Sequence, residues 1–321
     1  MAIGEKKRYL VNKGNARVRQ EAEERRLDPM MRALRVLHSA SAPDSMDQEE
    51  LEKQRRGQEI LGRLTAPMTG MKWEEFSLDG MPAAWMRLQS SHGGRRAVLY
   101  CHGGGYTSGN LGYSRVLASK MTSVTGMDVL TFEYRLAPEH PYPAAVEDGL
   151  RAWNYLMYLG YGAGDIVVAG DSAGGNLALV LCHRLKAAGR RLPAALLLMS
   201  PWTDMTMGGV SYTERAEIDP ILTPDYVRAV RAAYARENDL HSPSLSPLFG
   251  DFGGFPPTLI QVGTHEILFT DAQCLRERLD EAQVPCRLEI FEDMWHVFQM
   301  FPVKKAAAAM DNVSRFLIEH L

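Results

Sequence analysis

The chain has 321 residues, with 36 basic and 39 acidic side chains, a net charge of −3 and a pI near 6.3. Its apolar fraction of 45% and charged fraction of 23% exclude a disordered chain, and the near-neutral balance excludes the basic surface of a nucleic-acid-binding protein. A chain of this length is expected to fold as one large α/β domain with an accessory element, or as two small domains.

The first thirty residues contain eight Lys or Arg and no long apolar run, so we expect no signal peptide. The longest apolar stretch, Ala194–Met199, is too short to cross a membrane. Four cysteines without paired spacing, Cys101, Cys182, Cys274 and Cys286, indicate free buried thiols in a reducing compartment. We therefore expect a cytoplasmic protein with no membrane partner.

Residues 1–70 differ from the rest of the chain because they are dense in charge and lack strand patterns. Apolar residues recur there at helical spacing, in one group at Met30, Met31, Leu34 and Leu37 and in another at Ile60, Leu61 and Leu64. The spacing predicts two or three helices, each with one apolar side that packs onto another part of the protein.

From about residue 72, short apolar runs alternate with helical patterns. The runs are Ala97–Cys101, Asp128–Phe132, Ile166–Ala169, Ala194–Met199, Thr258–Val262 and Arg287–Phe291. The helical stretches are Ser114–Thr122, Pro143–Leu159, Gly175–Ala188, Asp271–Ala282 and Val303–His320. Buried strands separated by helices are typical of an α/β fold with a mostly parallel sheet covered on both faces. Two earlier strands, Trp73–Leu78 and Ala83–Leu88, alternate more and predict an antiparallel start.

Residues 203–250 interrupt this alternation. They contain a helical pattern near Thr223–Ala235 and a proline-rich stretch, His241–Pro247, but no further strand followed by a helix. We interpret the segment as an insertion into the α/β pattern.

The residues Gly170-Asp171-Ser172-Ala173-Gly174 directly follow the predicted strand Ile166–Ala169 and precede a helix. This is the G-x-S-x-G pattern, in which a sharp turn between strand and helix exposes a serine hydroxyl as a nucleophile. Glycines let neighbouring backbone pass close by, and the helix directs its free N–H groups at a developing anion. The pattern alone also arises by chance, so the prediction depends on the flanking strand and helix.

A second loop, His102-Gly103-Gly104-Gly105-Tyr106, follows the strand Ala97–Cys101. Hydrolases place further oxyanion donors in this position, and consecutive glycines allow N–H groups to converge on one oxygen. A phosphate-binding loop is disfavoured because no Gly-Lys-Ser/Thr follows and no helix starts at the glycines. A dinucleotide site is disfavoured because the acidic residue expected about 20 residues on does not follow a second strand.

Three motifs together resemble the hormone-sensitive-lipase-like family of bacterial esterases: HGGGY at 102–106, YRLAPEHPYPAA at 134–145 and GDSAGGNLA at 170–178. The resemblance runs from about residue 73 to the C-terminus. It implies an α/β-hydrolase fold and ester hydrolysis by a Ser–acid–His triad, with no cofactor. It also implies a helical cap in residues 1–70, a catalytic domain in residues 71–321 and a second cap segment at about 203–250. A metal site is disfavoured because no pair of histidines has ligand spacing with an acid.

We expect the triad in the chain order serine, acid, histidine, with Ser172 as nucleophile. His296 is the candidate base, because it lies just after the strand Arg287–Phe291 and matches the family's terminal His-Gly/Val-Phe motif. The expected oxyanion donors are the backbone N–H groups of Gly104, Gly105 and Ala173. His102 and Gly103 are expected to support the glycine loop.

The acid is sought after the strand Thr258–Val262. The family pattern there is commonly an aspartate followed two residues on by leucine, which the resemblance transfers to Glu266 and Leu268. Glutamate departs from the commoner aspartate, although the fold accepts either. Asp271 is the alternative acid, and its other interpretation is a cap of the following helix.

The resulting prediction is a serine carboxylesterase for short- to medium-chain esters that forms an acyl-enzyme. Its partner is a small-molecule ester, and homodimer formation is left open. The candidates for lining the substrate pocket are Tyr106, Asp171, Trp202, Met205, Tyr226 and Phe298. The alternative for each is a position in the hydrophobic core. An amide or peptide hydrolase with the same triad is an alternative function. A non-catalytic ligand-binding member of the fold is another, which the presence of both Ser172 and His296 disfavours.

Overall fold

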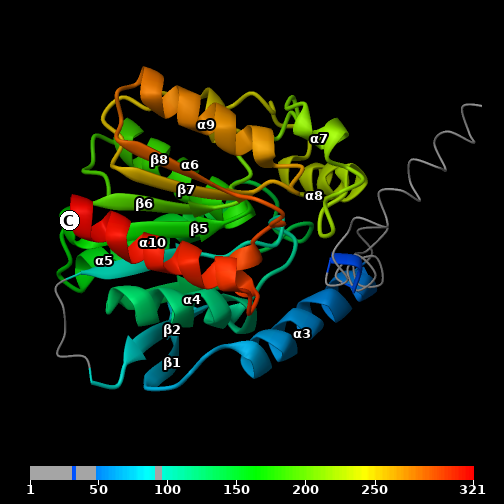
Figure 1. Cartoon of the computed structure of the whole chain (residues 1–321). Helices are drawn as coiled ribbons and strands as arrows, with labels where there is room; N and C mark the ends of the chain where they lie inside the picture. The colour runs from blue at the N-terminus through cyan, green and yellow to red at the C-terminus, as the bar shows by residue number, and fades with distance from the viewer. Residues whose placement is uncertain (1–30, 34–47, 91–95) are drawn as a thin grey trace, which may run out of the picture.

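The computed structural model describes residues 31–33, 48–90 and 96–321, which form an α/β fold (Figure 1). An eight-stranded sheet has the order β1-β2-β4-β3-β5-β6-β7-β8. The strands are β1 (Met71–Leu78), β2 (Met81–Leu88), β3 (Ala97–Cys101), β4 (Asp128–Phe132), β5 (Ile166–Asp171), β6 (Ala195–Met199), β7 (Thr258–Gly263) and β8 (Cys286–Phe291). Each predicted strand is therefore confirmed, with ends that move by at most two residues.

Pairing within the sheet places the loops of interest at one edge. β2 pairs antiparallel with β1 and β4, as expected, and the other pairs are parallel. The register aligns Gly170 of β5 with Cys101 of β3, and Gly263 of β7 with Phe291 of β8. The glycine loop, the serine motif and the two loops predicted to carry acid and base therefore leave the sheet at the same end. Open α/β sheets bind ligands at this carboxyl end.

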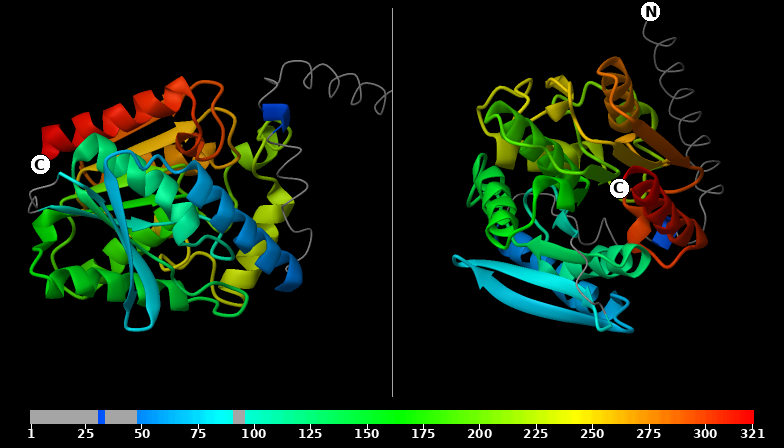
Figure 2. Two further views of the ribbon diagram at one scale, coloured as in Figure 1. Left: turned by 90° about the horizontal axis from the view of Figure 1, so that it is seen from below. Right: turned by 90° about the vertical axis from the view of Figure 1, so that its left-hand side faces the viewer.

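Helices cover both faces of the sheet, and the core consists of two apolar layers. The helices are α4 (Leu111–Thr125), α5 (Ala144–Tyr158), α6 (Ala173–Ala187), α9 (Phe269–Glu281) and α10 (Lys304–His320). Residues of α4 and α10 share one buried layer with the sheet, whereas those of α5, α6 and α9 share the other. Figure 2 shows α4 and α10 together on one side of the strands and α5 and α6 on the other.

The N-terminal segment is described in part, as residues 31–33 and the helix α3 (Gln48–Thr65), so Met30, Leu34 and Leu37 lie outside the described residues. Of the apolar side expected at Ile60, Leu61 and Leu64, the part at Ile60 and Leu64 is wrong, because these side chains are 61% and 79% exposed, and the Leu61 side chain lies outside the described residues. Instead α3 crosses α4 at two glycines: a Cβ on Gly62 would lie 1.9 Å from the carbonyl oxygen of Gly112. Backbone contact between two helices needs small residues, which a search for apolar spacing does not detect.

The expected insertion lies between β6 and β7. It contains α7 (Ser211–Glu214), α8 (Pro224–Ala235) and the short helix η2 (Pro247–Phe249). In Figure 1, α7, α8 and the beginning of α3 all lie beyond the same end of the sheet, the end at which the strands of the parallel part finish. Among the described residues, no helix is long and apolar enough to cross a membrane.

Candidate active site

Ser172 lies in a strained turn between β5 and α6. Its backbone φ is +54°, a value that costs a non-glycine residue free energy and recurs at functional sites. The turn needs glycine on either side: a Cβ on Gly170 would lie 2.2 Å from the Gly174 carbonyl oxygen, and one on Gly174 would lie 2.0 Å from that of Cys101. The helix begins at Ala173 instead of Gly175, so its free N–H groups start directly beside the serine hydroxyl.

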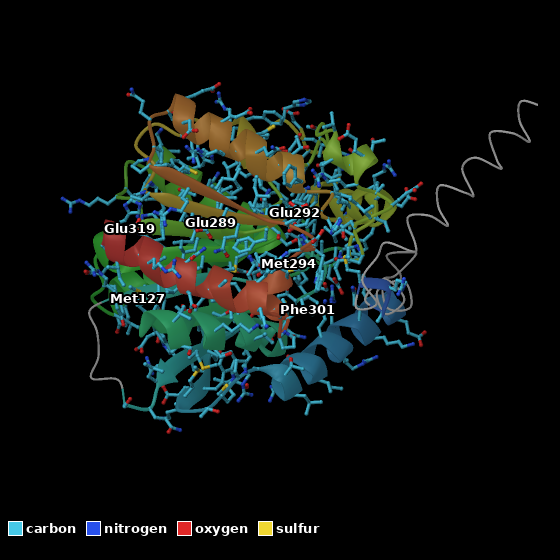
Figure 3. The ribbon with its side chains drawn as sticks, viewed as in Figure 1. Met127, Glu289, Glu292, Met294, Phe301 and Glu319 are labelled. Carbon is cyan, nitrogen blue, oxygen red and sulfur yellow. The ribbon has the colours of Figure 1, made fainter. Side chains whose placement is uncertain are left out.

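The three residues predicted as serine, acid and base are brought together by three loops. The Oγ atom of Ser172 lies 2.9 Å from Nε2 of His296, and Nδ1 of His296 lies 3.2 Å from Oε2 of Glu266. The serine is 9% exposed, the histidine 6% and the glutamate 0%, so burial increases from the serine hydroxyl to the carboxylate. Met294 and Phe301, which flank the turn of His296, lie at the end of the sheet nearest to the insertion (Figure 3).

The buried Glu266 carboxylate is held by groups that sequence reasoning missed. Its Oε1 atom accepts hydrogen bonds from the Gly263 N–H at 2.5 Å and from the Ser200 hydroxyl at 2.9 Å. The Ser200 hydroxyl also accepts the N–H of Val297, next to His296, at 3.1 Å. Ser200 directly follows β6, so the strand-end position that identified the other loops was an available signal.

Asp271 occupies a different place from the one expected. The N-cap of α9 is Leu268, and Asp271 lies inside the first turn, so the interpretation of Asp271 as the cap is wrong. Its Oδ2 atom accepts the N–H groups of Thr203 and Asp204 at 2.8 and 3.0 Å. Burial raises the pKa of this carboxyl to about 7. It anchors the start of the insertion, while His296 is hydrogen-bonded to Glu266.

The glycine loop bends sharply after β3. Gly104 and Gly105 have φ values of +111° and +63°, and the Gly104 carbonyl accepts the N–H groups of Thr107 and Ser108 at 3.1 and 2.9 Å. Among the described residues, the N–H groups of Gly104, Gly105 and Ala173 have no hydrogen-bond acceptor. These three unused backbone donors, two in the glycine loop and one at the start of α6, are available to bind an anionic oxygen.

Asp171, a pocket candidate, is instead a buried anchor of this loop. Its carboxylate accepts the Tyr100 hydroxyl at 2.6 Å, the Tyr113 hydroxyl at 2.6 Å and the Gly103 N–H at 2.9 Å. Burial raises the pKa of the Asp171 carboxyl, while the bonds from the two tyrosines act in the opposite direction. A Cβ on Gly103 would lie 2.3 Å from Oδ2 of Asp171, which explains the glycine at that position.

His102 is packed into the loop. Its ring stacks on Tyr134 with centroids 4.1 Å apart, and its Nδ1 atom lies 2.8 Å from the Gly103 carbonyl oxygen. Burial lowers the pKa of His102 to about 4, so the ring is neutral near pH 7. The Tyr134 hydroxyl donates to the His102 carbonyl at 2.8 Å, which ties the second sequence motif to the first.

The remaining pocket candidates are distributed between the core and the insertion. Tyr106 is fully buried, stacks on Tyr234 and donates its hydroxyl to Asn176 at 2.7 Å. Three others are also buried in apolar clusters, namely Trp202, Met205 and Phe298. Tyr226 of α8 is half-buried. For all but Tyr226, the core alternative agrees with the observed burial.

The four cysteines are free, with Cys101 and Cys182 buried and Cys274 and Cys286 half-buried. Within the described ranges, no group of three His, Cys, Asp or Glu side chains is arranged to hold a metal ion.

Similar structures have been solved for several bacterial esterases. An esterase of the bacterial hormone-sensitive lipase family superposes with a TM-score of 0.84 at 34% identity, covering 91% of this chain and 98% of the other. The esterase EstE5, in a crystal soaked with p-nitrophenyl butyrate, superposes with a TM-score of 0.83 at 33% identity, covering 91% of this chain and 99% of the other.

Sequence comparison agrees with these structures. Residues 98–300 match the α/β-hydrolase fold family. An acetyl-hydrolase of Streptomyces hygroscopicus is 37% identical over 77% of this chain and 80% of its own length. An esterase of Acinetobacter venetianus is 35% identical over 74% of this chain and 79% of its own length. The chain belongs to the α/β-hydrolase family, in the hormone-sensitive-lipase-like branch that includes bacterial esterases.

Proposed function

We propose that the chain is a carboxylesterase that hydrolyses short- to medium-chain esters through Ser172, His296 and Glu266. The observation that carries this proposal is the continuous chain of contacts from the serine hydroxyl through both imidazole nitrogens to a fully buried carboxylate, at 2.9 and 3.2 Å. Membership of a family that includes enzymes named esterase and acetyl-hydrolase supports the same chemistry.

In the first half-reaction, Oγ of Ser172 attacks the ester carbonyl carbon while Nε2 of His296 takes the hydroxyl proton. Glu266 orients the imidazole through Nδ1 and stabilises its charged form. The tetrahedral oxyanion accepts the free N–H groups of Gly104, Gly105 and Ala173, each donor being worth about 3 kcal/mol. The bond to the alcohol oxygen then breaks, and Nε2 returns the proton to that oxygen.

In the second half-reaction, water attacks the acyl-enzyme. His296 takes a proton from the water as its oxygen bonds to the carbonyl carbon, and the same three N–H groups stabilise the second oxyanion. Collapse of this intermediate breaks the bond to Oγ and returns the proton to Ser172. The products are a carboxylic acid and the regenerated enzyme.

Two segments support a covered site of limited size. Val230 of α8 packs on the glycine loop, because a Cβ on Gly105 would lie 3.1 Å from it. Arg55 of α3 donates to the Thr107 carbonyl at 2.9 Å, and Gln58 accepts the Gly109 N–H at 2.9 Å. We infer that α3 and the insertion act as the two parts of a cap over the site.

A covered pocket limits the acyl chain. Each methylene gains about 0.8 kcal/mol only while it fits, so kcat/KM should rise to acyl chains of roughly four to eight carbons and then fall. The test is a series of p-nitrophenyl esters from acetate to palmitate, with Ser172→Ala as the inactive control. Preferential hydrolysis of emulsified long-chain esters would contradict the covered site, and faster hydrolysis of the matching anilides would favour an amide hydrolase.

A further inference from the structure

The loop that carries Glu266 is joined on one side to the insertion by two side chains. The N–H of Ile267, the next residue, donates to Oδ2 of Asp219 at 2.9 Å. The carbonyl of the same residue accepts the hydroxyl of Ser211 at 2.5 Å. The backbone N–H and the backbone carbonyl of Ile267, the residue after Glu266, are therefore both bound by side chains of the insertion.

Asp219 is itself held rigidly. Its Oδ1 atom accepts the N–H groups of Ile221 and Leu222 at 2.8 and 2.9 Å, and the side chain is 2% exposed. These two residues lead directly into α8, the helix whose Val230 packs on the glycine loop. A single buried carboxylate thus connects the acid loop with the start of the helix that covers the oxyanion donors.

Ser211 adds a second attachment a few residues away. Its hydroxyl accepts the Thr270 N–H at 3.0 Å, and its own N–H donates to the Thr270 hydroxyl at 3.1 Å. Arg215 donates to the Thr264 carbonyl and places its guanidinium 3.9 Å from the ring centre of Phe269. The insertion therefore contacts the acid loop on both sides of Glu266.

Groups at the ends of the sheet strands hold one of the two carboxylate oxygens of Glu266. The Gly263 N–H and the Ser200 hydroxyl hold Oε1 of Glu266, whereas Oε2 reaches His296 at 3.2 Å, the long end of the hydrogen-bond range. The direction of Oε2 depends on where the backbone of Glu266 and Ile267 lies. A misplacement of about 1 Å at a catalytic group can cost as much as about 10²-fold in rate.

Resting on the proposed function, we propose that Asp219 is a positioning residue for Glu266, acting through the N–H of Ile267, with Ser211 as its partner on the Ile267 carbonyl. The insertion therefore has a second role besides covering the site: it sets the geometry of the acid–imidazole contact. Substitutions at Asp219 should lower kcat while leaving KM nearly unchanged, because Asp219 acts on the triad through the backbone instead of binding the substrate.

The experiment compares Asp219→Ala and Asp219→Asn with Asp225→Ala, a carboxylate of the same insertion that is 94% exposed and pairs with Arg228. We expect Asp219→Ala to lower kcat by about 10- to 100-fold with KM changed less than about threefold, Asp219→Asn to fall between it and wild type, and Asp225→Ala to match wild type. Circular dichroism checks folding. If Asp219→Ala does not fold, Asp219→Asn and Ser211→Ala provide the test.

The pH profile separates positioning from a purely structural role. The acidic groups that act on His296 are Glu266, Asp171 and Asp219, and Arg215 acts on Glu266. A displaced Glu266 stabilises the imidazolium less, so the acidic limb of kcat/KM should move to lower pH in the Asp219 variants. Because Asp219 also acts on His296 directly through its charge, the same shift in Ser211→Ala, which removes no charge, is the readout that reports positioning. A lower melting temperature with an unchanged kcat and profile would overturn the positioning role.

Labelling of Ser172 by an alkyl fluorophosphonate provides a readout that does not depend on the ester chosen. The labelling rate should fall in the Asp219 variants in parallel with kcat and be zero in Ser172→Ala. Equal labelling rates in wild type and Asp219→Ala would overturn the role of Asp219 while leaving the proposed function intact. If the Asp219 variants are labelled more slowly than wild type but wild type hydrolyses no ester, the proposed substrate class alone is overturned.

Discussion

The carboxylate of Asp171 accepts the backbone N–H of Gly103 at 2.9 Å, and this bond joins the nucleophile turn to the glycine loop. Asp171 immediately precedes Ser172, and Gly103 immediately precedes Gly104. The bond therefore couples the position of the serine turn to that of the proposed oxyanion donors. The two tyrosine hydroxyls on the same carboxylate fix its orientation.

Replacing this carboxylate should lower kcat. We expect Asp171→Ala to cost as much as about 10²-fold, because the glycine loop loses its anchor and the oxyanion donors shift. Tyr113→Phe removes one donor but keeps the bond to Gly103, so it should cost much less. Steady-state kinetics with p-nitrophenyl butyrate measure both variants. Equal kcat in Asp171→Ala and wild type would show that the loop holds its position without this bond.

Removing the nucleophile should abolish hydrolysis without disturbing the fold. Ser172→Ala deletes only the attacking oxygen, and we expect a loss on the order of 10⁶-fold in kcat by comparison with other serine hydrolases. Unfolding curves should show a variant about as stable as wild type, because the substitution leaves the backbone strain at φ +54° unchanged and removes only one hydroxyl group. A folded variant that retains a tenth of wild-type activity would exclude Ser172 as the nucleophile.

Substitutions of the two buried acids, Glu266 and Asp271, should lower kcat to very different extents. Glu266→Gln removes the charge that stabilises the imidazolium and should lower kcat by orders of magnitude. Asp271→Asn keeps an oxygen for the N–H groups of Thr203 and Asp204, so kcat should change little. Both are measured on the same p-nitrophenyl ester. The opposite ranking, in variants that fold, would transfer the catalytic role to Asp271.

Acid should destabilise the protein partly through His183. Burial lowers the pKa of His183 to about 4, whereas an unfolded histidine titrates near 6.5. Between these values the unfolded state binds more protons, so stability falls as pH falls, by up to about 1.4 kcal/mol per pH unit. His183→Gln should lack this component, while His140→Gln, at an exposed position, should retain it.

The variants must be compared because the carboxyl of Asp271 changes the stability of the protein with pH in the opposite direction. The raised pKa of Asp271 means that the folded state binds more protons than the unfolded state from about pH 4 to 7, so this carboxyl stabilises the protein as pH falls. Urea unfolding at pH 4.5, 5.5 and 6.5 gives the slope for each variant. Identical slopes in wild type and His183→Gln would contradict the buried neutral imidazole.

Two glycine substitutions should have opposite effects on stability. Gly104→Ala forces a side chain onto a φ of +111° and a Cβ to within 2.4 Å of the Ser108 carbonyl oxygen, so we expect a loss of about 1–3 kcal/mol together with reduced activity. Gly57→Ala lies in α3 with open space around the Cβ and should gain about 0.5–1 kcal/mol. Thermal unfolding distinguishes them, and a stable, active Gly104→Ala variant would contradict the strained loop.

The sequence by itself determined the elements that depend on local backbone and burial. Continuous apolar runs identified the strands, because a strand covered on both faces excludes polar residues. The glycines around Ser172 and in the 102–106 loop identified their turns, because the backbone there allows no Cβ. The position of His296 after a strand identified the candidate base, because parallel strands end at one edge of the sheet.

Only the tertiary structure decided which groups support that site. The partners of Glu266 and Ile267, namely Ser200, Ser211 and Asp219, lie 48 to 66 residues away in sequence. Ser200 is marked in the sequence only by its position after a strand, and Ser211 and Asp219 by no pattern, because a hydrogen bond between two loops depends on which loops the strand order brings together. The same reason explains Asp171, which is an anchor instead of a pocket wall. It also explains α3, where two glycines in contact replaced the expected apolar side.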